Sequence, residues 1–322
     1  MNIDISIITV NYNSLNYIKS CVDSISSFLC SKGSAFCEMI IVDNGSSDGS
    51  ADYIGRLTKQ YGNIYLTGES KNLGFCKACN IGASKANGKF LLFLNPDTRF
   101  ISGSAEEVIK FYDEKSKGSK VGAIGAKLVN PDGTIQYSCR SFPTLARQFY
   151  ESYFLHRLFK NSSVFGAYFL SWWNHGSARG VDWLSGAFMF IKRKDFVRAG
   201  GFDEDYFMYS EDSDLCFRLH KNGYKNYYFP FFVVEHADSG IASKNNALRE
   251  AGIWKSRRLY FKKNYSLFHA EILSFLYFLG VINRVVVFTV LSIFTAKKQN
   301  KKRLQTYLKT LKLYFAGWPV KK

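Results

Sequence analysis

The sequence predicts an α/β fold in which a mostly parallel sheet is flanked by helices. Apolar runs at residues 5–10, 39–42 and 90–94 have the length of buried strands. The first two are each followed by a turn of Asn, Ser, Asp or Gly residues and then by a segment with helical periodicity. Strands that are apolar throughout and alternate with helices are typical of a parallel sheet covered on both faces. Ligands of such sheets bind where the strands end, so polar residues there are candidates for function.

Composition indicates a folded protein with unevenly placed charge. The chain has 322 residues, of which 47% are hydrophobic and 21% charged, and its formal net charge is +17. Residues 249–322 contain 16 Lys and Arg residues against two acids, a net charge of +14, so residues 1–248 carry only +3. Seven cysteines without regular spacing do not indicate a disulfide framework and favour a reducing compartment. The first residues read as a strand and lack the pattern of a signal peptide.

Two aspartates follow predicted strands directly. The strand at 39–42 ends at Asp43, at the edge where a ligand is expected. The strand at 90–94 ends in the turn Asn95-Pro96-Asp97-Thr98, where the proline restricts the backbone and Asp97 is presented at the same edge. Such oxygen ligands suit Mg²⁺ or Mn²⁺, which use one or two protein carboxylates together with substrate phosphates. The alternative is an ordinary turn.

A lone Cys-x-x-Cys pair lies in the helix that follows residues 71–75. Cys76 and Cys79 have no second pair and no nearby histidine in the sequence. We therefore interpret them as two small residues on a helix face and not as zinc ligands.

Six carboxylates lie between residues 203 and 214 of this basic chain. Like charges this close raise one another's pKa, so the cluster needs a helix N-terminus, a cation or a catalytic task to offset the repulsion. A helix from about residue 211 to Lys221 accounts for the acids in its first turn. It does not account for all six, which indicates that some of them are functional.

Short motifs along the chain resemble one enzyme family. In order, they read T-V-N-Y-N, V-D-N-G-S-S-D-G-S, N-L-G-F, F-L-N-P-D, W-L-S-G-A, G-G-F-D-E-D-Y-F-M and E-D-S-D-L-C-F-R. This series is similar to family 2 glycosyltransferases of the GT-A fold, and most similar to their rhamnosyltransferase-like branch, which extends bacterial surface polysaccharides. The match covers residues 3 to about 240. It implies a GT-A, Rossmann-like sheet, mostly parallel and flanked by helices.

The resemblance implies a binding site for a nucleotide-sugar donor. The implied donor-binding residues are Thr9, Asn11, Asp43, Asn72, Gly74, Asn95, Ser185 and Gly186. The first three would contact the base and ribose, the next two would lie near the diphosphate or the sugar, and the last two would line the sugar pocket. For Gly186, relief of packing in a strand is the alternative.

The resemblance also implies a divalent cation, Mg²⁺ or Mn²⁺, beside the donor diphosphate. Asn95 and Asp97 stand where the family often has Asp-x-Asp, so an amide with only a neutral carbonyl oxygen replaces the first carboxylate. His236, at the end of a predicted strand, resembles the family's late histidine, which is a third metal ligand or a diphosphate contact. A structural histidine is the alternative.

Two adjacent acids are candidates for the general base. Transfer from a nucleotide sugar requires a positioned carboxylate that deprotonates the acceptor hydroxyl. We expect Asp212 to do this while the hydroxyl attacks the anomeric carbon and inverts it. Glu211 is the alternative base, and the acids at residues 203–205 are expected to form a turn beside the site.

The chain is expected to divide into a glycosyltransferase domain at residues 1–247 and a basic, apolar helical region at residues 248–322. Asn283 and Arg284 interrupt the apolar stretch 272–296, leaving runs of 11 and 12 residues, shorter than the roughly 20 that span a bilayer. Basic residues on both sides favour an interfacial helical hairpin on anionic lipid, with an ordinary helical subdomain as the alternative. The aromatic-rich residues 145–180 are either a buried helix pair or a further membrane-interface surface.

These inferences predict an inverting glycosyltransferase, peripheral on the cytoplasmic face of the inner membrane. The resemblance implies a dTDP- or UDP-sugar donor, preferably dTDP-rhamnose as a source of L-rhamnose, and a lipid-linked oligosaccharide acceptor of O-antigen or capsule synthesis. A sugar-phosphate nucleotidyltransferase is the alternative enzyme, but the first strand lacks a Gly-rich, basic loop for a triphosphate. A basic nucleic-acid-binding protein is disfavoured because long apolar runs separate the basic clusters.

Overall fold

The computed structural model describes residues 3–29, 36–237, 246–295 and 297–316. By their contacts they form two compact units. The sheet unit comprises residues 1–141, 174–207 and 211–240, and the helical unit comprises residues 142–173, 208–210 and 241–322. The aromatic-rich residues 145–173 therefore pack within the helical unit. The division into domains at residue 247 stays a prediction.

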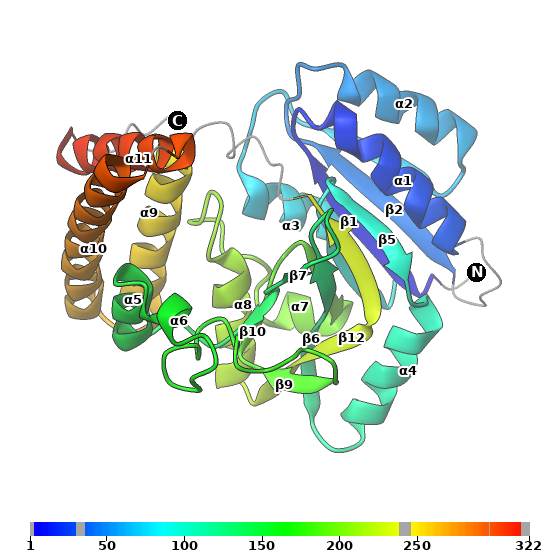
Figure 1. The fold of residues 1–322 in the computed structure, drawn as a ribbon. Coiled ribbons are helices and arrows are strands. Elements are labelled where there is room, and N and C mark those ends of the chain that lie inside the picture. The colour runs from blue at the N-terminus through cyan, green and yellow to red at the C-terminus, as the bar shows by residue number, and fades with distance from the viewer. Residues whose placement is uncertain (1–2, 30–35, 238–245, 296, 317–322) are drawn as a thin grey trace. The chain divides into compact units, whose positions relative to one another are not determined.

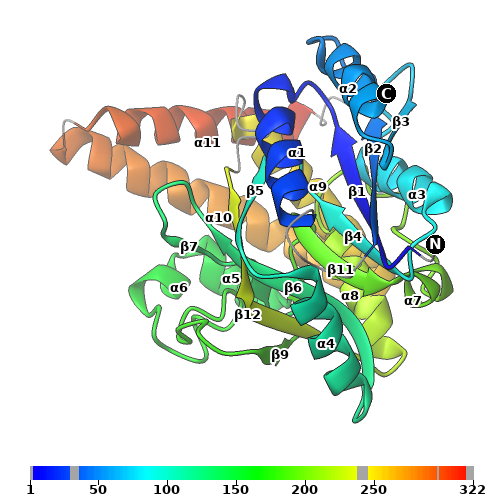
Figure 2. The ribbon, with the colours of Figure 1, turned by 90° about the vertical axis from the view of Figure 1, so that its right-hand side faces the viewer.

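The sheet unit is built on one large mixed sheet (Figures 1 and 2). Its strand order is β3-β2-β1-β4-β11-β6-β12-β5, with β7 beside β6 and β9 beside β12, and β8 and β10 form a separate two-stranded sheet. The bounds are β1 Ile5–Asn11, β2 Cys37–Asp43, β3 Ile64–Gly68, β4 Phe90–Leu94, β5 Thr98–Ser102, β6 Lys120–Val129, β7 Ile135–Gln136, β8 Cys139–Arg140, β9 Arg179–Val181, β10 Trp183–Leu184, β11 Phe188–Lys192 and β12 Tyr224–His236.

The first half of the sheet is parallel, as the alternation of apolar strands and helices predicts. Strand β1 pairs in parallel with β2 and β4, and β2 pairs in parallel with β3. The register sets Asn11 opposite Asp43, so the carboxyl ends of β1 and β2 coincide. Strand β11 then runs antiparallel to both β4 and β6. The start of β11 therefore meets the end of β4, which brings the segments before β11 to the functional edge of the sheet.

Helices cover both faces of this sheet. They are α1 Leu15–Leu29, α2 Ser50–Gln60, α3 Phe75–Lys85, α4 Ala105–Ser116, α7 Arg193–Arg198 and α8 Glu211–Lys221. Apolar residues of α1, α2 and α4 form the main core with one face of the strands. Helix α3 packs on the opposite face through Gly82, where an added Cβ would lie 2.5 Å from Cγ2 of Ile8. Cys76 and Cys79 are buried in α3, as expected for small residues on a helix face.

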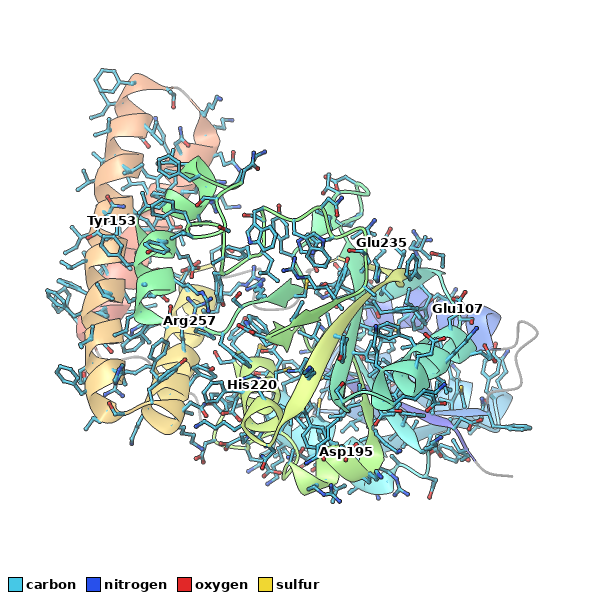
Figure 3. All side chains as sticks on the ribbon, turned by 90° about the horizontal axis from the view of Figure 1, so that it is seen from below. Glu107, Tyr153, Asp195, His220, Glu235 and Arg257 are labelled. Carbon is cyan, nitrogen blue, oxygen red and sulfur yellow. The ribbon has the colours of Figure 1, made fainter. Side chains whose placement is uncertain are left out.

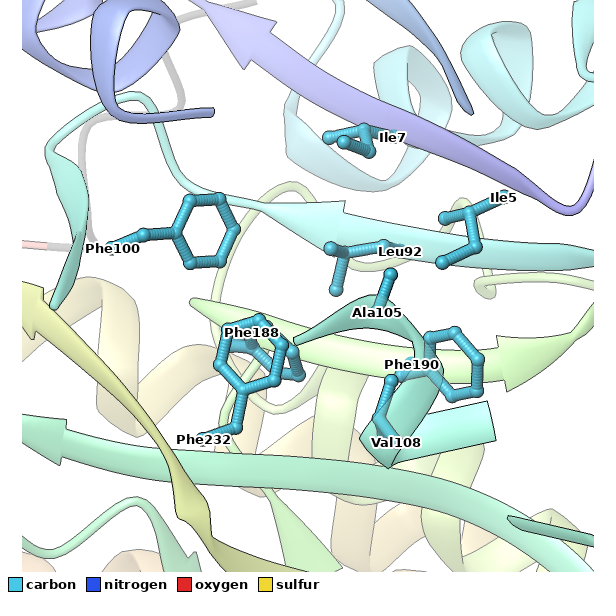
Figure 4. Close-up of a pocket in the computed structure, with 9 residues that line it drawn as sticks. All are labelled: Ile5, Ile7, Leu92, Phe100, Ala105, Val108, Phe188, Phe190 and Phe232. Atoms are coloured by element: carbon cyan, nitrogen blue, oxygen red, sulfur yellow. The ribbon is translucent and has the colours of Figure 1, made fainter. Parts of the chain in front are cut away.

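An apolar cavity of about 10 Å³ lies between the sheet and α4 (Figure 4). Its lining residues are Ile5, Ile7, Leu92, Phe100, Ala105, Val108, Phe188, Phe190 and Phe232. A volume this small holds at most about one water molecule, and an apolar lining offers that water no hydrogen bonds. The cavity is therefore a packing void of the core and not a substrate site.

The helical unit contains α5 Leu145–Ser152, α6 Leu155–Leu158, α9 Asn246–Asn264, α10 Leu267–Phe294 and α11 Lys298–Ala316. The prediction of a helical hairpin within residues 272–296 is wrong, because α10 continues through Asn283 and Arg284. The Asn283 amide donates to the carbonyl of Ser152 (3.2 Å) and the Arg284 guanidinium to that of Glu151 (3.3 Å). These polar residues satisfy the last carbonyls of α5 while the backbone of α10 stays helical. Within the described residues, only α10 has the length and apolar composition of a membrane-crossing helix.

Candidate active site

The ends of β1 and β2 hold a buried polar cluster. Nδ2 of Asn11 donates to Oδ1 of Asp43 at 2.6 Å, and the backbone N–H of Ser46 donates to Oδ2 of Asp43 at 3.1 Å. Asn11, Asp43 and Thr9 are all buried, and the Thr9 hydroxyl has no hydrogen-bond partner. The structure thus brings together the three residues that were predicted to contact the nucleoside. A buried hydroxyl without a partner is unusual and makes Thr9 a candidate ligand contact.

Asn44, whose long-range contacts no sequence motif indicates, holds the loop of Asn72 and Gly74 against this edge. Its Nδ2 donates to Oδ1 of Asn72 (3.0 Å) and to the carbonyl of Gly74 (3.2 Å), while the N–H of Leu73 donates to its Oδ1 (2.9 Å). Asn72 and Gly74 therefore lie beside the end of β2. An asparagine between Asp43 and a glycine reads as a turn residue, so only its long-range partners distinguish it.

Gly74 is required by its surroundings. Its φ is 91°, and an added Cβ would lie 2.8 Å from the Phe207 ring and 2.9 Å from the Phe207 carbonyl oxygen. That carbonyl also accepts the N–H of Phe75 at 2.7 Å. The segment before α8 is thus attached to the start of α3.

The Asn-Pro-Asp turn meets His236 at the far end of β12. Strand β12 pairs with β5 so that His236 lies opposite Thr98. Nε2 of His236 lies 3.3 Å from Oδ1 of Asp97 and 3.3 Å from Nδ2 of Asn95. The three residues that were predicted to bind a metal are therefore adjacent, and the side chains of Asp97 and His236 are about nine-tenths buried.

The hydrogen bond of His236 to Gln136 fits a cation site. Nδ1 of His236 lies 2.7 Å from Oε1 of Gln136, an acceptor, so this ring nitrogen carries the hydrogen. Nε2 is then an acceptor that lies 3.3 Å from the Nδ2 donor of Asn95 and 3.3 Å from Oδ1 of Asp97, so a cation held by Asp97 and His236 would take the place of the Asn95 N–H at this nitrogen. The described residues contain no group of three or more His, Cys, Asp or Glu side chains suited to a metal.

The Ser185-Gly186-Ala187 turn connects this cluster to the acids at the start of α8. The N–H of Asn95 donates to the carbonyl of Ala187 at 3.2 Å, and the N–H of Gly186 donates to Oδ2 of Asp212 at 3.2 Å. The N–H of Ser185 donates to the carbonyl of Ser138 at 2.7 Å. The Ser185-Gly186-Ala187 turn therefore contacts both Asp212 and the Asn-Pro-Asp segment, although more than a hundred residues separate these two in sequence.

Glu211 and Asp212 differ in burial and in hydrogen bonding. Glu211 is buried, and its Oε2 has no hydrogen-bond partner. Burial, together with the neighbouring charges of Asp212 and Asp214, raises the pKa of Glu211 well above its ordinary value. Asp212 is partly exposed, and burial also raises its pKa, but the N–H groups of Gly186 and Ser213 and the charge of Arg140 oppose that rise. Of the two acids, Asp212 is thus the one that ionises more readily.

The other acids of the cluster have structural roles. Asp214 forms an ion pair with Nε of Arg218 at 2.7 Å and accepts the Tyr206 hydroxyl at 3.3 Å. Arg218 also donates to the carbonyl of Gly201 at 2.9 Å, which holds the turn that precedes the cluster. Asp203 accepts the N–H of Asp205 at 3.0 Å within that turn. The turn expected at residues 203–205 is therefore present.

Comparisons with known proteins agree with this architecture. The model of the family "Glycosyl transferase family 2" matches residues 6–174. An N-acetylglucosaminyl-diphospho-decaprenol L-rhamnosyltransferase of Mycobacterium tuberculosis is 30% identical over 248 residues, covering 71% of this chain and 75% of the relative. Rhamnosyltransferase WbbL of Escherichia coli is 33% identical over 157 residues, covering 47% and 53%.

A solved structure shows the same fold at low sequence identity. Mannosyltransferase PcManGT of Pyrobaculum calidifontis superposes with a TM-score of 0.58 at 15% identity, covering 99% of this chain and 88% of the neighbour. The family model and the relatives, together with the sheet and its edge, assign the chain. It belongs to glycosyl transferase family 2, is rhamnosyltransferase-like, and is a glycosyltransferase.

Proposed function

We propose that the protein transfers L-rhamnose from dTDP-rhamnose, with inversion, to a hydroxyl of a lipid-linked intermediate of bacterial surface polysaccharide synthesis. The mycobacterial relative is named for transfer of L-rhamnose to a diphospho-decaprenol acceptor, which supports both the sugar and the acceptor class. A UDP-sugar donor is the second candidate, because a structurally similar enzyme, TarS of S. aureus, has been solved with UDP-GlcNAc. A lipid-linked acceptor also supports a peripheral location on the cytoplasmic face of the inner membrane.

The edge of the parallel strands would bind the donor. Thr9, Asn11 and Asp43 would contact the nucleoside, and the hydrogen bond from Asn11 holds the Asp43 carboxylate in place for a ribose hydroxyl. Asn72 and Gly74 would lie against the diphosphate or the sugar, because Asn44 holds their loop beside β2.

Asp212 would act as the general base. Its carboxylate takes the proton of the acceptor hydroxyl as the hydroxyl oxygen forms a bond to the anomeric carbon and the bond from that carbon to the nucleotide diphosphate breaks. The observation that carries this assignment is the 3.2 Å hydrogen bond from Gly186 N–H to Oδ2 of Asp212. It fixes the carboxylate beside the turn that also contacts Asn95. A positioned base of this kind contributes about 10²- to 10⁴-fold to rate.

Asp97, His236 and the side-chain amide oxygen of Asn95 would hold a divalent cation, Mg²⁺ or Mn²⁺. Structural neighbours support a cation here, since PcManGT was solved with GDP-Man and Mn²⁺ and GalNAc-T7 with UDP, GalNAc and Mn²⁺. When bound, the cation neutralises charge on the departing diphosphate. Gln136 orients His236 so that Nε2 faces the site.

Substitution of the base tests the proposal. Asp212→Asn is expected to lower transfer at least about 100-fold while nucleotide affinity stays close to wild type. Asp205→Asn, the same change at an exposed acid of the preceding turn, is the matched control and should leave transfer unchanged. Rates are measured with dTDP-rhamnose and UDP-sugars on a lipid-linked acceptor, and affinity by thermal shift with dTDP, UDP and GDP in Mn²⁺. Near wild-type transfer by Asp212→Asn would exclude Asp212 as the base.

A further inference from the structure

We propose that the outer face of α10, defined as Phe268, Phe275, Ile282, Val286 and Ile293, docks the helical unit onto an anionic bilayer while α10 lies in the membrane interface without crossing it. This proposal names the surface by which the protein would reach the membrane. It rests on the proposed function, because a lipid-linked acceptor requires the enzyme to work at a membrane. Its geometry comes from the helical unit alone. Figure 3 shows this unit with its side chains, including Tyr153 and Arg257.

The outer face is a continuous apolar stripe. At about 100° per residue, its five members fall within about 20° of one line along the helix. Their exposed fractions range from 38% at Ile282 to 73% at Ile293. Single exposed apolar residues are common on soluble proteins, whereas a contiguous row of them marks an interaction surface. Two charged residues belong to α10: Arg284 lies on the opposite side of the helix, and the exposed Glu271 borders the stripe near its start, where it forms an ion pair with Arg258.

The inner face of α10 is committed to the helical unit. Its buried residues are Ala270, Leu273, Ser274, Tyr277, Gly280, Val281, Arg284 and Phe288. Gly280 allows close approach to α5, because an added Cβ would lie 2.6 Å from Cβ of Ser152. Asn283 and Arg284 donate to the last carbonyls of α5, and the Tyr277 hydroxyl donates to the carbonyl of Glu250 in α9 at 3.2 Å. A helix attached in this way cannot cross a bilayer without α5 and α9.

Helix α11 lies antiparallel beside α10 and is strongly basic. The rings of Phe288 and Tyr307 stack at 5.7 Å, and those of Phe278 and Tyr314 lie 5.2 Å apart. The exposed basic residues of α11 are Lys298, Lys301, Lys302, Arg303, Lys309 and Lys312. If α10 spanned the membrane with α11 beside it, these charges would enter hydrocarbon, at a cost of about 2.5–3.5 kcal/mol each on insertion scales. The packed pair therefore favours an orientation in the plane of the interface.

The charge of the unit selects anionic lipid as the occupant. Exposed Lys262 and Lys263 precede α10, and exposed Lys297 and Lys298 follow it. An apolar stripe with cations at both ends matches the boundary between acyl chains and anionic headgroups. Each such cation near an anionic surface contributes about 1 kcal/mol, so the association should weaken with salt.

Co-sedimentation of the full chain with vesicles tests the surface. We expect binding to vesicles of phosphatidylglycerol and phosphatidylcholine, and little binding to phosphatidylcholine alone. Phe275→Glu with Val286→Glu should lower the bound fraction about tenfold or more. Val197→Glu, the same kind of change at a residue of the sheet unit that is 67% exposed, is the control and should bind like wild type. Equal binding by the double variant would overturn the proposal. Circular dichroism checks that each variant folds.

Further measurements distinguish lipid from other partners of this face, and distinguish a failure of this proposal from a failure of the proposed function. Alkaline carbonate should release the full chain from membranes, and retention would show a spanning helix and overturn the interfacial orientation. If the double variant instead converts a dimer to a monomer in light scattering, a second copy covers the face and the lipid assignment is wrong. Transfer to a soluble acceptor analogue should be unchanged in the double variant. Absence of transfer in wild type would contradict the proposed function alone.

Discussion

At the scale of single residues, Glu211 and Asp212 are neighbours in different surroundings. Glu211 is buried with an unpaired oxygen, whereas Asp212 accepts two backbone N–H groups and is partly exposed. Donors aimed at a carboxylate stabilise its charged form, and burial without donors destabilises it. Of these two adjacent acids, Asp212 is therefore suited to accept a proton from the acceptor hydroxyl, whereas Glu211 tends to stay protonated.

Replacing Glu211 should stabilise the protein above acidic pH. Because the pKa of Glu211 is raised in the folded state, its ionisation opposes folding once the pH exceeds the ordinary value of 4.5. Below that value both states are protonated and the penalty vanishes. Glu211→Gln should therefore raise the thermal midpoint more at pH 7 than at pH 4, and should retain more transfer than Asp212→Asn. A midpoint difference that shrinks as the pH rises would contradict the assignment.

Arg140 should set the pH dependence of the proposed base. It lies on β8 opposite Trp183 of β10, with its guanidinium 5.1 Å from the indole ring, and its charge lowers the pKa of Asp212. Glu211 and Asp214 are the neighbouring acids on α8. Arg140→Gln should raise the pKa of Asp212 and move the acidic limb of the kcat/KM profile to higher pH, while Arg140→Lys should largely restore it. A profile unchanged in Arg140→Gln would exclude this role.

At the scale of elements, two-residue strands and turns position the site. Strand β7 pairs with the end of β6 and places Gln136 against His236 of β12. The turn before β11 contacts both the end of β4 and the start of α8. Such short segments carry little periodicity, so the pattern of apolar residues that predicts the long strands does not predict their contacts.

Loss of the Gln136 contact should weaken the cation binding proposed for Asp97 and His236. Removing the partner that orients a metal-ligating histidine typically lowers metal affinity by about 10- to 100-fold. Gln136→Leu should therefore lower Mn²⁺-dependent nucleotide affinity by about tenfold or more and leave affinity without Mn²⁺ unchanged. Calorimetry with and without Mn²⁺ measures both, with Gln305→Leu on exposed α11 as control. Equal losses under the two conditions would point to a folding defect.

At the scale of the whole molecule, the two units differ in the interactions that stabilise them. The sheet unit has an apolar core between a sheet and its helices. The helical unit contains an ion pair of Arg257 and Glu151 at 2.8 Å, joined by Gln148 and Tyr168, whose side chains both bond to Arg257. Despite burial, the charges of Arg257 and Arg284 lower the pKa of Glu151.

The helical unit should therefore lose stability on acidification through Glu151. A lowered pKa in the folded state means that the Glu151 charge stabilises above the ordinary value of 4.5 and that this contribution is lost as the pH falls through the folded value. Glu151→Gln removes the charged partner of Arg257, which keeps its hydrogen bonds to Gln148 and Tyr168, and should cost about 1.5–3 kcal/mol at neutral pH. In urea unfolding, the gap between this variant and wild type should narrow from pH 7 to pH 3. A constant gap would show that the Glu151 charge is not involved.

Much of the sheet unit was predictable because its signals are local. The apolar runs at 5–10, 39–42 and 90–94 form β1, β2 and β4, and the motifs place Asp43 and Asp97 at strand ends. The order of the later strands was less accessible, since β11 enters antiparallel between β4 and β6 through pairings that are distant in sequence. The roles of Asn44 and Gln136 were not predictable for the same reason, because they depend on partners 28 and 100 residues away.

By itself, the sequence determined the fold class, the family and the set of acids and amides at the strand ends, because periodicity and motifs are properties of neighbouring residues. Only the tertiary structure decided that Asp212 and not Glu211 receives the Gly186 N–H, and that Asn283 and Arg284 bind the end of α5 from within a continuous α10. Both outcomes depend on which backbone groups are brought near a polar side chain by packing. That proximity sets the energy of a buried charge or amide, and no local pattern encodes it.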